Sequence, residues 1–254
     1  MVRRQRRTGL LDDRARVILA ALVEEHIRTA IPVGSMALSD GYDLGVSPAT
    51  VRGVLVELEE LGLLMQPHTS AGRIPTDLGY RVFVDKLATV KPMSSAERRA
   101  IETFLDEANN LDQLMKRSAK LLADLTKQVA VITYPIIGEG LGSEKMTISG
   151  TANLARSGED LGTSLSPILE ALEEQVVLLS LLNEVHPTVH VRIGSEQTEA
   201  NLQATSLVTV GYGMESAQIG AVGVLGPTRM DYAGSIAAVD AVARYVGRFI
   251  NEGA

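Results

Sequence analysis

Residues 44–76 read LGVSPATVRGVLVELEELGLLMQPHTSAGRIPT, and this stretch decides the fold of the first part of the chain. Ser47 is suited to cap a helix, and Pro48 fits the first turn of one. Apolar residues then recur at helical spacing and predict one buried stripe; they are Val51, Val54, Leu55, Leu58 and Leu61. A polar turn over 67–72 and Arg73 follow, which predicts a β-hairpin carrying a basic residue. A capped helix followed directly by such a hairpin is the layout of a winged helix, a module that usually binds duplex DNA.

The residues before this stretch complete a helix-turn-helix. Asp12 or Asp13 can cap a first helix, and Ser35 opens a short second one. A turn with glycines over 41–45 leads into the long helix, as helix-turn-helix motifs require. The second helix of such a pair lies in the major groove with its N-terminal residues facing the bases. The sequence therefore predicts a winged helix-turn-helix domain over residues 12–90.

The predicted DNA contacts come from the start of the long helix and from the wing. Arg52 can reach a guanine edge or a phosphate, and the sequence leaves both possibilities open. On the wing, Arg73 would follow the DNA backbone or the minor groove, and the hydroxyl groups of the turn would bond phosphates. The predicted DNA-binding residues are Ser47, Thr50, Arg52, His68, Thr69, Ser70 and Arg73.

Several longer phrases in the chain are distinctive. In the first part they are PVGS (32–35), LGVSPATVR (44–52), LEELG (58–62), QPHTSAGRIPT (66–76) and GYRVFVDKL (79–87). Later they are GTANLA (150–155), ILEALEEQVVLLSLL (168–182), VRIG (191–194) and LGPTRMDYAGSIAAVDAVARYV (225–246). With these phrases, the segment 14–87 resembles the N-terminal domain of the HrcA family of heat-inducible transcription repressors. The stretch TVKPMSSAERRAIETFL (89–105) also resembles members of this family from high-GC Gram-positive bacteria. The later phrases are similar to the C-terminal parts of such repressors, so the resemblance covers most of the chain.

This resemblance implies both a fold and a function. It implies a GAF-like domain after the winged helix. It also implies a repressor that binds an inverted-repeat operator of the CIRCE type upstream of chaperone operons and is released on heat stress. The GroEL chaperonin is the implied partner that keeps the repressor active, and a homodimer is implied because an inverted repeat needs two DNA-binding units.

The chain departs from the family pattern in two places. Gly53 follows Arg52 where the family usually carries a polar side chain, often asparagine, and glycine weakens a helix interior. A long dimerising segment normally follows the strand equivalent to 129–135, and here only the shortened insert 136–144 spans that gap. Gly53 and this shortening favour the alternative of a dimerisation-deficient paralogue that binds operators weakly.

The remaining chain predicts an α+β fold with an antiparallel sheet. We expect a flexible basic arm over 1–11, connecting helices over 91–128 and a GAF-like regulatory domain over 129–254. Within this domain we expect strands at 129–134, 189–193, 206–212 and 217–225, a long helix at 164–183 and a last helix at 231–250. A GAF-like domain leaves open a second alternative, a regulator that responds to a small molecule.

Composition is that of an intracellular regulator without thiol chemistry. The 254 residues contain no cysteine and carry a formal charge of −7. The charge is divided unevenly, because residues 1–91 hold 12 Lys+Arg and 11 Asp+Glu, which places the acidic excess after them. No apolar run approaches the length of a membrane span or follows the N-terminal arginines as a secretion signal would, so we expect a cytoplasmic protein.

The sequence gives little sign of catalysis or of a cofactor. The four histidines are scattered, and Pro187 lies between His186 and His190, so we expect no metal site, no cofactor and no enzyme activity. For Arg229 and Asp231 in the phrase GPTRMDY we expect an ion pair and a helix cap.

Overall fold

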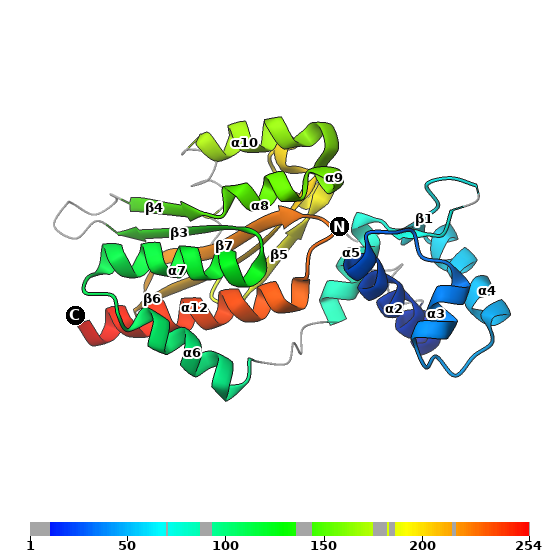
Figure 1. Ribbon diagram of the computed structural model, residues 1–254, viewed down its shortest axis with the longest axis horizontal. Helices are drawn as coiled ribbons and strands as arrows, with labels where there is room; N and C mark the ends of the chain where they lie inside the picture. Colours follow the sequence, from blue (N-terminus) through cyan, green and yellow to red (C-terminus); the bar gives the residue numbers. More distant parts are fainter. Residues whose placement is uncertain are drawn as a thin grey trace. The chain divides into compact units, whose positions relative to one another are not determined.

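The computed structural model describes residues 11–69, 71–86, 93–135, 144–174, 182, 186–214 and 217–253. The chain divides into two units, residues 1–89 and residues 90–254. Figure 1 shows the elements of both units, and each unit is described by itself. Within the described residues, no helix is long and apolar enough to cross a membrane.

The first unit contains the predicted helix-turn-helix. Its helices are α2 (Asp13–Thr29), α3 (Ser35–Gly41), α4 (Pro48–Glu60) and α5 (Asp77–Lys86). Asp12 caps α2 by accepting the N–H of Ala15 at 2.6 Å, and Ser47 caps α4 as predicted. Fully buried leucines and isoleucine from three helices form the core; they are Ile18, Leu19, Leu22, Leu38, Leu55 and Leu58.

A small sheet forms the wing. Strand β1 (Leu64–Met65) pairs antiparallel with β2 (Ile74–Pro75), and Val33 bridges to Arg73 through two backbone hydrogen bonds of 2.9 Å. The bridge needs Gly72, because a Cβ there would lie 2.5 Å from the carbonyl carbon of Val33. The wing is thus held to the segment between α2 and α3 as well as to its own hairpin.

The second unit is built on a five-stranded sheet. Its strands are β3 (Val129–Pro135), β4 (Glu144–Ser149), β5 (His190–Ile193), β6 (Thr205–Met214) and β7 (Ala217–Pro227). Their order across the sheet is β4-β3-β7-β6-β5, and every neighbouring pair is antiparallel. This is the predicted α+β domain on an antiparallel sheet, with a GAF-like layout.

Helices cover both faces of this sheet (Figure 1). On one face lie α7 (Leu111–Thr126) and α12 (Tyr232–Gly253), and α6 (Ser95–Leu105) packs against them through Ile101, Leu105 and Tyr245. On the other face, α8 (Thr151–Arg156), α9 (Gly158–Leu161) and α10 (Leu165–Glu173) pack on the inward residues of β3, β6 and β7. The two helices expected over 91–128 are therefore part of the second unit, because their apolar faces pack on its sheet and on its last helix.

Two expectations about the second unit were wrong. The helix expected over 164–183 ends at Glu173, because Glu174 has extended backbone angles, and most residues from 175 to 185 lie outside the described part. The second is a missing element, because no strand was expected at 144–149. Strand β4 lies there and pairs with β3 from Ala130↔Ser149 to Pro135↔Glu144. Its side chains are exposed or half-buried, so it lacks the strong apolar pattern that marks an interior strand. Of the shortened insert expected at 136–144, residues 136–143 are outside the described part, and Glu144 is the first residue of β4.

Candidate nucleic-acid interface

Helix α4 has one face in the core and one in solvent. Val51, Leu55 and Leu58 are fully buried, whereas Ala49 and Arg52 are exposed. Core and solvent residues alternate with the helical period, so a continuous outward stripe runs along α4. This stripe is the surface that the helix can offer to a DNA groove.

The predicted contacts at the start of α4 lie together on this surface. The Ser47 hydroxyl accepts the backbone N–H of Thr50 at 3.2 Å and lies 3.0 Å from the Thr50 hydroxyl. Arg52 is exposed, is the sole Lys or Arg of α4, and takes part in none of the ion pairs of the described residues. One free guanidinium and two hydroxyl-bearing residues therefore stand at the exposed N-terminal end of the helix.

The tip of the wing carries the other predicted contacts. His68 and Thr69 are exposed, and Ser70 lies outside the described residues. The side-chain amide of Gln66 donates hydrogen bonds to the carbonyl oxygens of Thr69 at 3.0 Å and Ala71 at 2.8 Å. Gln66 therefore fixes the shape of the turn, a role that the sequence does not predict because nothing local distinguishes Gln66 from a polar surface residue.

Arg73 of the wing lies in an ion pair, and its predicted contact with DNA stays a prediction. Its Nε donates to a carboxylate oxygen of Glu59 on α4 at 2.9 Å, and only 16% of its side chain is exposed. The guanidinium thus links the wing to α4 instead of standing free toward solvent. In this geometry Arg73 positions the wing.

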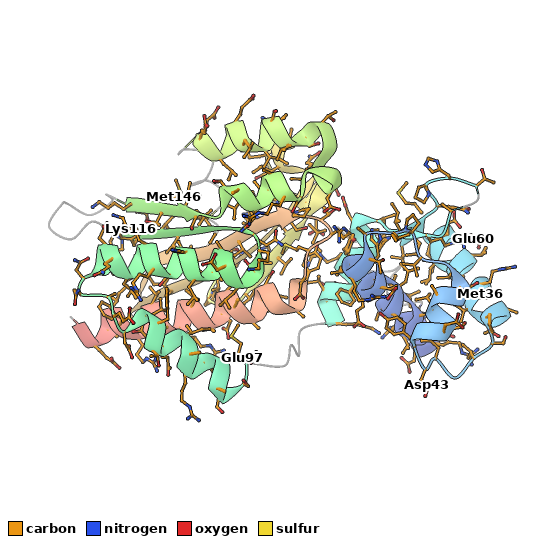
Figure 2. The ribbon with its side chains drawn as sticks, viewed as in Figure 1. Met36, Asp43, Glu60, Glu97, Lys116 and Met146 are labelled. Carbon is orange, nitrogen blue, oxygen red and sulfur yellow. The ribbon has the colours of Figure 1, made fainter. Side chains whose placement is uncertain are left out.

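Acidic side chains lie on both sides of the exposed face of α4 along the chain. Asp40 and Asp43 lie before α4, and Glu57 and Glu60 lie on its later turns, all exposed. Figure 2 labels Asp43 in the loop before α4 and Glu60 on the helix. Since carboxylates repel phosphate, the attraction of this surface for DNA depends on Arg52 and on cations outside α4.

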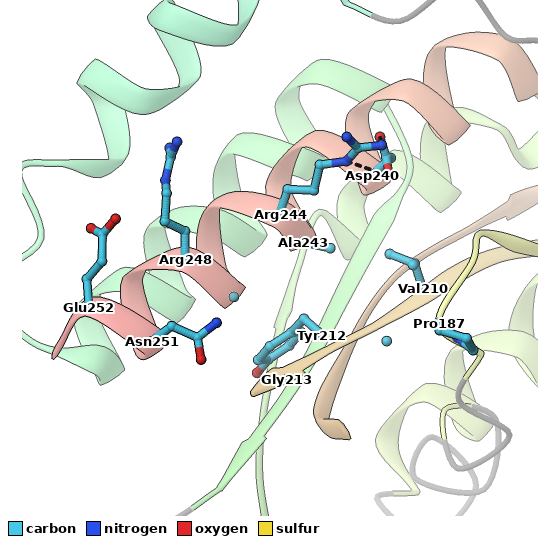
Figure 3. Close-up of a pocket in the computed structure, with 12 residues that line it drawn as sticks. Pro187, Val210, Tyr212, Gly213, Asp240, Ala243, Arg244, Arg248, Asn251 and Glu252 are labelled. Carbon is cyan, nitrogen blue, oxygen red and sulfur yellow. Dashed lines mark hydrogen bonds and ion pairs between the residues drawn. The ribbon is translucent and has the colours of Figure 1, made fainter. Parts of the chain in front are cut away.

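The second unit has an open groove between β6 and α12 (Figure 3). Its volume is about 620 Å³, and its lining includes Tyr212, Asp240, Arg244 and Arg248. Arg244 pairs with Asp240 at 2.8 Å, and Arg248 pairs with Glu102 at 2.7 Å. Both arginines are paired with carboxylates and Glu252 also lines the groove, so its described lining does not favour an anionic ligand.

Two histidines and the GPTRMDY phrase were the remaining candidates in the second unit. The rings of His186 and His190 lie 4.6 Å apart, and no group of three or more metal-ligating side chains occurs among the described residues. Arg229 forms two hydrogen bonds of 2.7 Å with Asp160, and Asp231 caps α12 by accepting the N–H of Gly234 at 3.0 Å. The ion pair and the cap expected for the GPTRMDY phrase are confirmed.

The chain is similar to known transcription repressors. A family model described as the HrcA protein C terminal domain matches residues 136–236. The heat-inducible transcription repressor HrcA of a Nocardioides species is 39% identical over 335 residues, covering 95% of this chain and 99% of the relative. The repressor of the same name from Thermobifida fusca is 39% identical over 337 residues, covering 95% and 98%.

A solved structure shows the same fold. A crystal structure of a hypothetical protein superposes with a TM-score of 0.83 at 22% identity, covering 96% of this chain and 100% of that one. The named relatives are repressors and not enzymes, as the absence of a catalytic motif predicted. Neither alternative from the sequence, the dimerisation-deficient paralogue or the ligand-responsive regulator, gains support from them.

These alignments are longer than the chain. In the Nocardioides alignment, 95% of the 254 residues is about 241, whereas the alignment spans 335 positions. About 94 of its positions therefore have no counterpart here.

Proposed function

This chain belongs to the HrcA family of heat-inducible transcription repressors, and we propose that it represses heat-shock genes by binding an inverted-repeat operator of the CIRCE type. The observation that carries the proposal is the match to these repressors over 95% of the chain, together with a winged helix whose recognition helix exposes a free arginine. DNA binding would block transcription at normal temperature, and heat would relieve it.

The contacts we propose come from α4 and the tip of the wing. Ser47, Thr50 and Arg52 would enter the major groove at the N-terminal end of α4, as in other helix-turn-helix proteins. His68, Thr69 and Ser70 would contact the DNA backbone from the wing. Arg73 would set the angle of the wing through its ion pair with Glu59.

We propose that the active form is a homodimer. An inverted repeat presents two half-sites related by a twofold axis, so two copies of α4 must be held at a fixed separation. The strands flanking the shortened insert already pair directly, with Pro135 opposite Glu144. The surfaces that hold two copies together would then lie on the remaining parts of the chain.

Heat release and location follow from the same proposal. The GroEL chaperonin would keep the repressor folded, and unfolded proteins would compete for it on heating. A loss of one or two kcal/mol is enough to unfold much of a marginally stable protein, so withdrawal of the chaperonin would lower the active population.

Because the proposed target of this protein is chromosomal DNA, we propose that it is located in the cytoplasm.

The test is binding of the full chain to an inverted-repeat operator and to a scrambled duplex at two salt concentrations, with the oligomeric state measured in parallel. We expect a dimer that prefers the operator, with affinity for both duplexes falling as salt rises. Equal affinity for the two duplexes would contradict the proposed function. Selective binding by a monomer would contradict only the homodimer.

Arg52→Ala separates the two roles that the sequence left open for this arginine. If Arg52 reads a base, operator affinity should fall by about 1–3 kcal/mol while affinity for the scrambled duplex changes little. Equal losses on both duplexes, with a salt slope reduced by about one, would make Arg52 a phosphate contact.

A further inference from the structure

Three small or apolar residues lie along the middle of the outward face of α4. Ala49, Gly53 and Val56 are separated by four and three residues, which places them in one row on a helix. All three are exposed, and the row lies opposite the buried Val51 and Leu58. The row therefore faces whatever the recognition helix meets.

Val56 differs from an ordinary surface valine by its position. The exposed fraction of Val56 is 41%, and that of Val17 on α2 is 52%. Exposure alone therefore does not mark Val56 as functional, because single exposed apolar residues are common on protein surfaces. However, Val56 continues the row of Ala49 and Gly53, which reaches the exposed acidic Glu60 one turn later, and its other exposed neighbour Glu57 is also acidic. It is the large apolar group of the surface that we propose enters the groove.

Ala49 and Gly53 leave space beside the backbone of α4. Ala49 projects only a methyl group, and a Cβ added at Gly53 would meet nothing within 4 Å. The helix backbone can therefore come close to the bases along this row. Seven residues separate Ala49 from Val56, which is about 10 Å along the helix axis and matches roughly three base-pair steps of 3.4 Å.

The major groove offers one apolar group to such a side chain. Guanine, cytosine and adenine present donors and acceptors there, whereas thymine adds its C5-methyl group. An isopropyl group can contact this methyl group but can form no hydrogen bond with a base edge. The chemistry of Val56 therefore fits thymine.

We propose that Val56 reads a thymine methyl group in each operator half-site, and that Ala49 and Gly53 provide the close approach that it needs. This inference rests on the proposed function, because it requires α4 to lie in the major groove. It assigns to Val56 a part in specificity that is separate from the polar contacts at the start of the helix.

The experiment combines a protein change with a DNA change. The full-length wild type and Val56→Ala are titrated with the operator and with operators in which one thymine of each half-site is replaced by deoxyuridine, which lacks the methyl group. At one position, we expect the replacement to weaken wild-type binding about fourfold per half-site, as for one buried methyl group. Val56→Ala should bind the unmodified operator about as weakly as the wild type binds the operator with deoxyuridine. It should not distinguish thymine from deoxyuridine at that position.

Val17→Ala is the matched control, since it shortens another exposed valine, which lies outside α4. It should keep the wild-type preference for thymine, and urea unfolding should show that both variants stay folded. The proposal is overturned if Val56→Ala binds like the wild type, or if it keeps the thymine preference at every position. If the wild type does not prefer the operator over scrambled DNA, the proposed function fails first, and the two failures are thereby distinguished.

Discussion

Gly53 is a helix-interior glycine that no contact within the folded chain requires. It lies in the middle of α4, its φ is not positive, and a Cβ would meet nothing within 4 Å. Glycine costs a helix interior roughly 0.5–1 kcal/mol relative to alanine. We therefore expect Gly53→Ala to raise the free energy of unfolding of the first unit by about that amount, measured by urea denaturation.

Gly79 provides the opposite case on α5. A Cβ there would lie 2.1 Å from the carbonyl oxygen of Leu63, which is backbone and cannot move aside easily. Gly79→Ala should therefore destabilise the first unit by more than about 1 kcal/mol. If Gly53→Ala proved as damaging as Gly79→Ala, the open environment of Gly53 would be refuted.

At the scale of elements, the wing is attached to the recognition helix by one ion pair. Arg73 and Glu59 are 16% and 35% exposed at their side chains, so solvent screens the pair only in part. We expect Arg73→Ala and Glu59→Ala each to lower the free energy of unfolding by roughly 0.5–1 kcal/mol. The double variant should lose little more than either single one, because both remove the same interaction.

A double-mutant cycle from urea unfolding curves measures this coupling. Glu57→Ala is the control, since Glu57 is an exposed glutamate on the same helix. It should add to Arg73→Ala without coupling. Additive losses for Arg73→Ala and Glu59→Ala would show that the pair contributes nothing to the attachment of the wing.

The attachment of α6 to α12 depends on a tyrosine. The Tyr245 hydroxyl donates to the Asp106 carboxylate at the end of α6, and Arg248 pairs with Glu102 at 2.7 Å. Burial first, and then the hydrogen bond to Asp106, raises the pKa of Tyr245 to about 12. The neutral phenol is thus favoured in the folded protein. Its contribution to stability is fully present below pH 10 and is lost as the pH rises through 12.

Tyr245→Phe should therefore be less stable than the wild type at pH 9, and this difference should shrink between pH 10 and 12. Urea midpoints of both proteins across this range give the measurement. Subtracting the variant removes the effect of the other tyrosines, such as Tyr212, whose pKa is also raised by burial. A difference that stays constant up to pH 12 would show that Tyr245 is not the titrating group.

For the whole molecule, the uneven distribution of charge along the chain affects its electrostatic attraction to DNA. The chain carries −7, but residues 1–91 carry 12 Lys+Arg and 11 Asp+Glu. Four of those cations are Arg3, Arg4, Arg6 and Arg7, which precede the described residues. The acidic remainder repels phosphate, so these arginines are a large share of what can attract it.

Replacing the four arginines by glutamine should weaken binding to operator and scrambled DNA alike. Each lost phosphate contact should reduce the slope of log affinity against log salt by about 0.9. Fluorescence titration at several salt concentrations measures this slope. An unchanged slope would mean that the arm makes no phosphate contact, as expected of a solubilising tail.

The sequence determined the features of this protein that depend on near neighbours along the chain. The Ser47 cap and the cap at Asp231 both join residues three apart, so their types and spacing suffice to predict them. Helical periodicity likewise predicted the buried stripe of α4. The phrases that resemble the HrcA family were also visible in the sequence, and that resemblance implied the GAF-like domain.

Only the tertiary structure decided the interactions between distant parts of the chain. Arg73 pairs with Glu59, 14 residues away in the sequence, and Arg229 pairs with Asp160, 69 residues away. No local sequence pattern predicts which residues form such pairs. Strand β4 exists because β3 pairs with it, not because its own residues favour a strand. The physical reason is that caps and periodicity are fixed by bonds within one turn, whereas ion pairs, strand register and helix ends depend on packing that forms only in the folded chain.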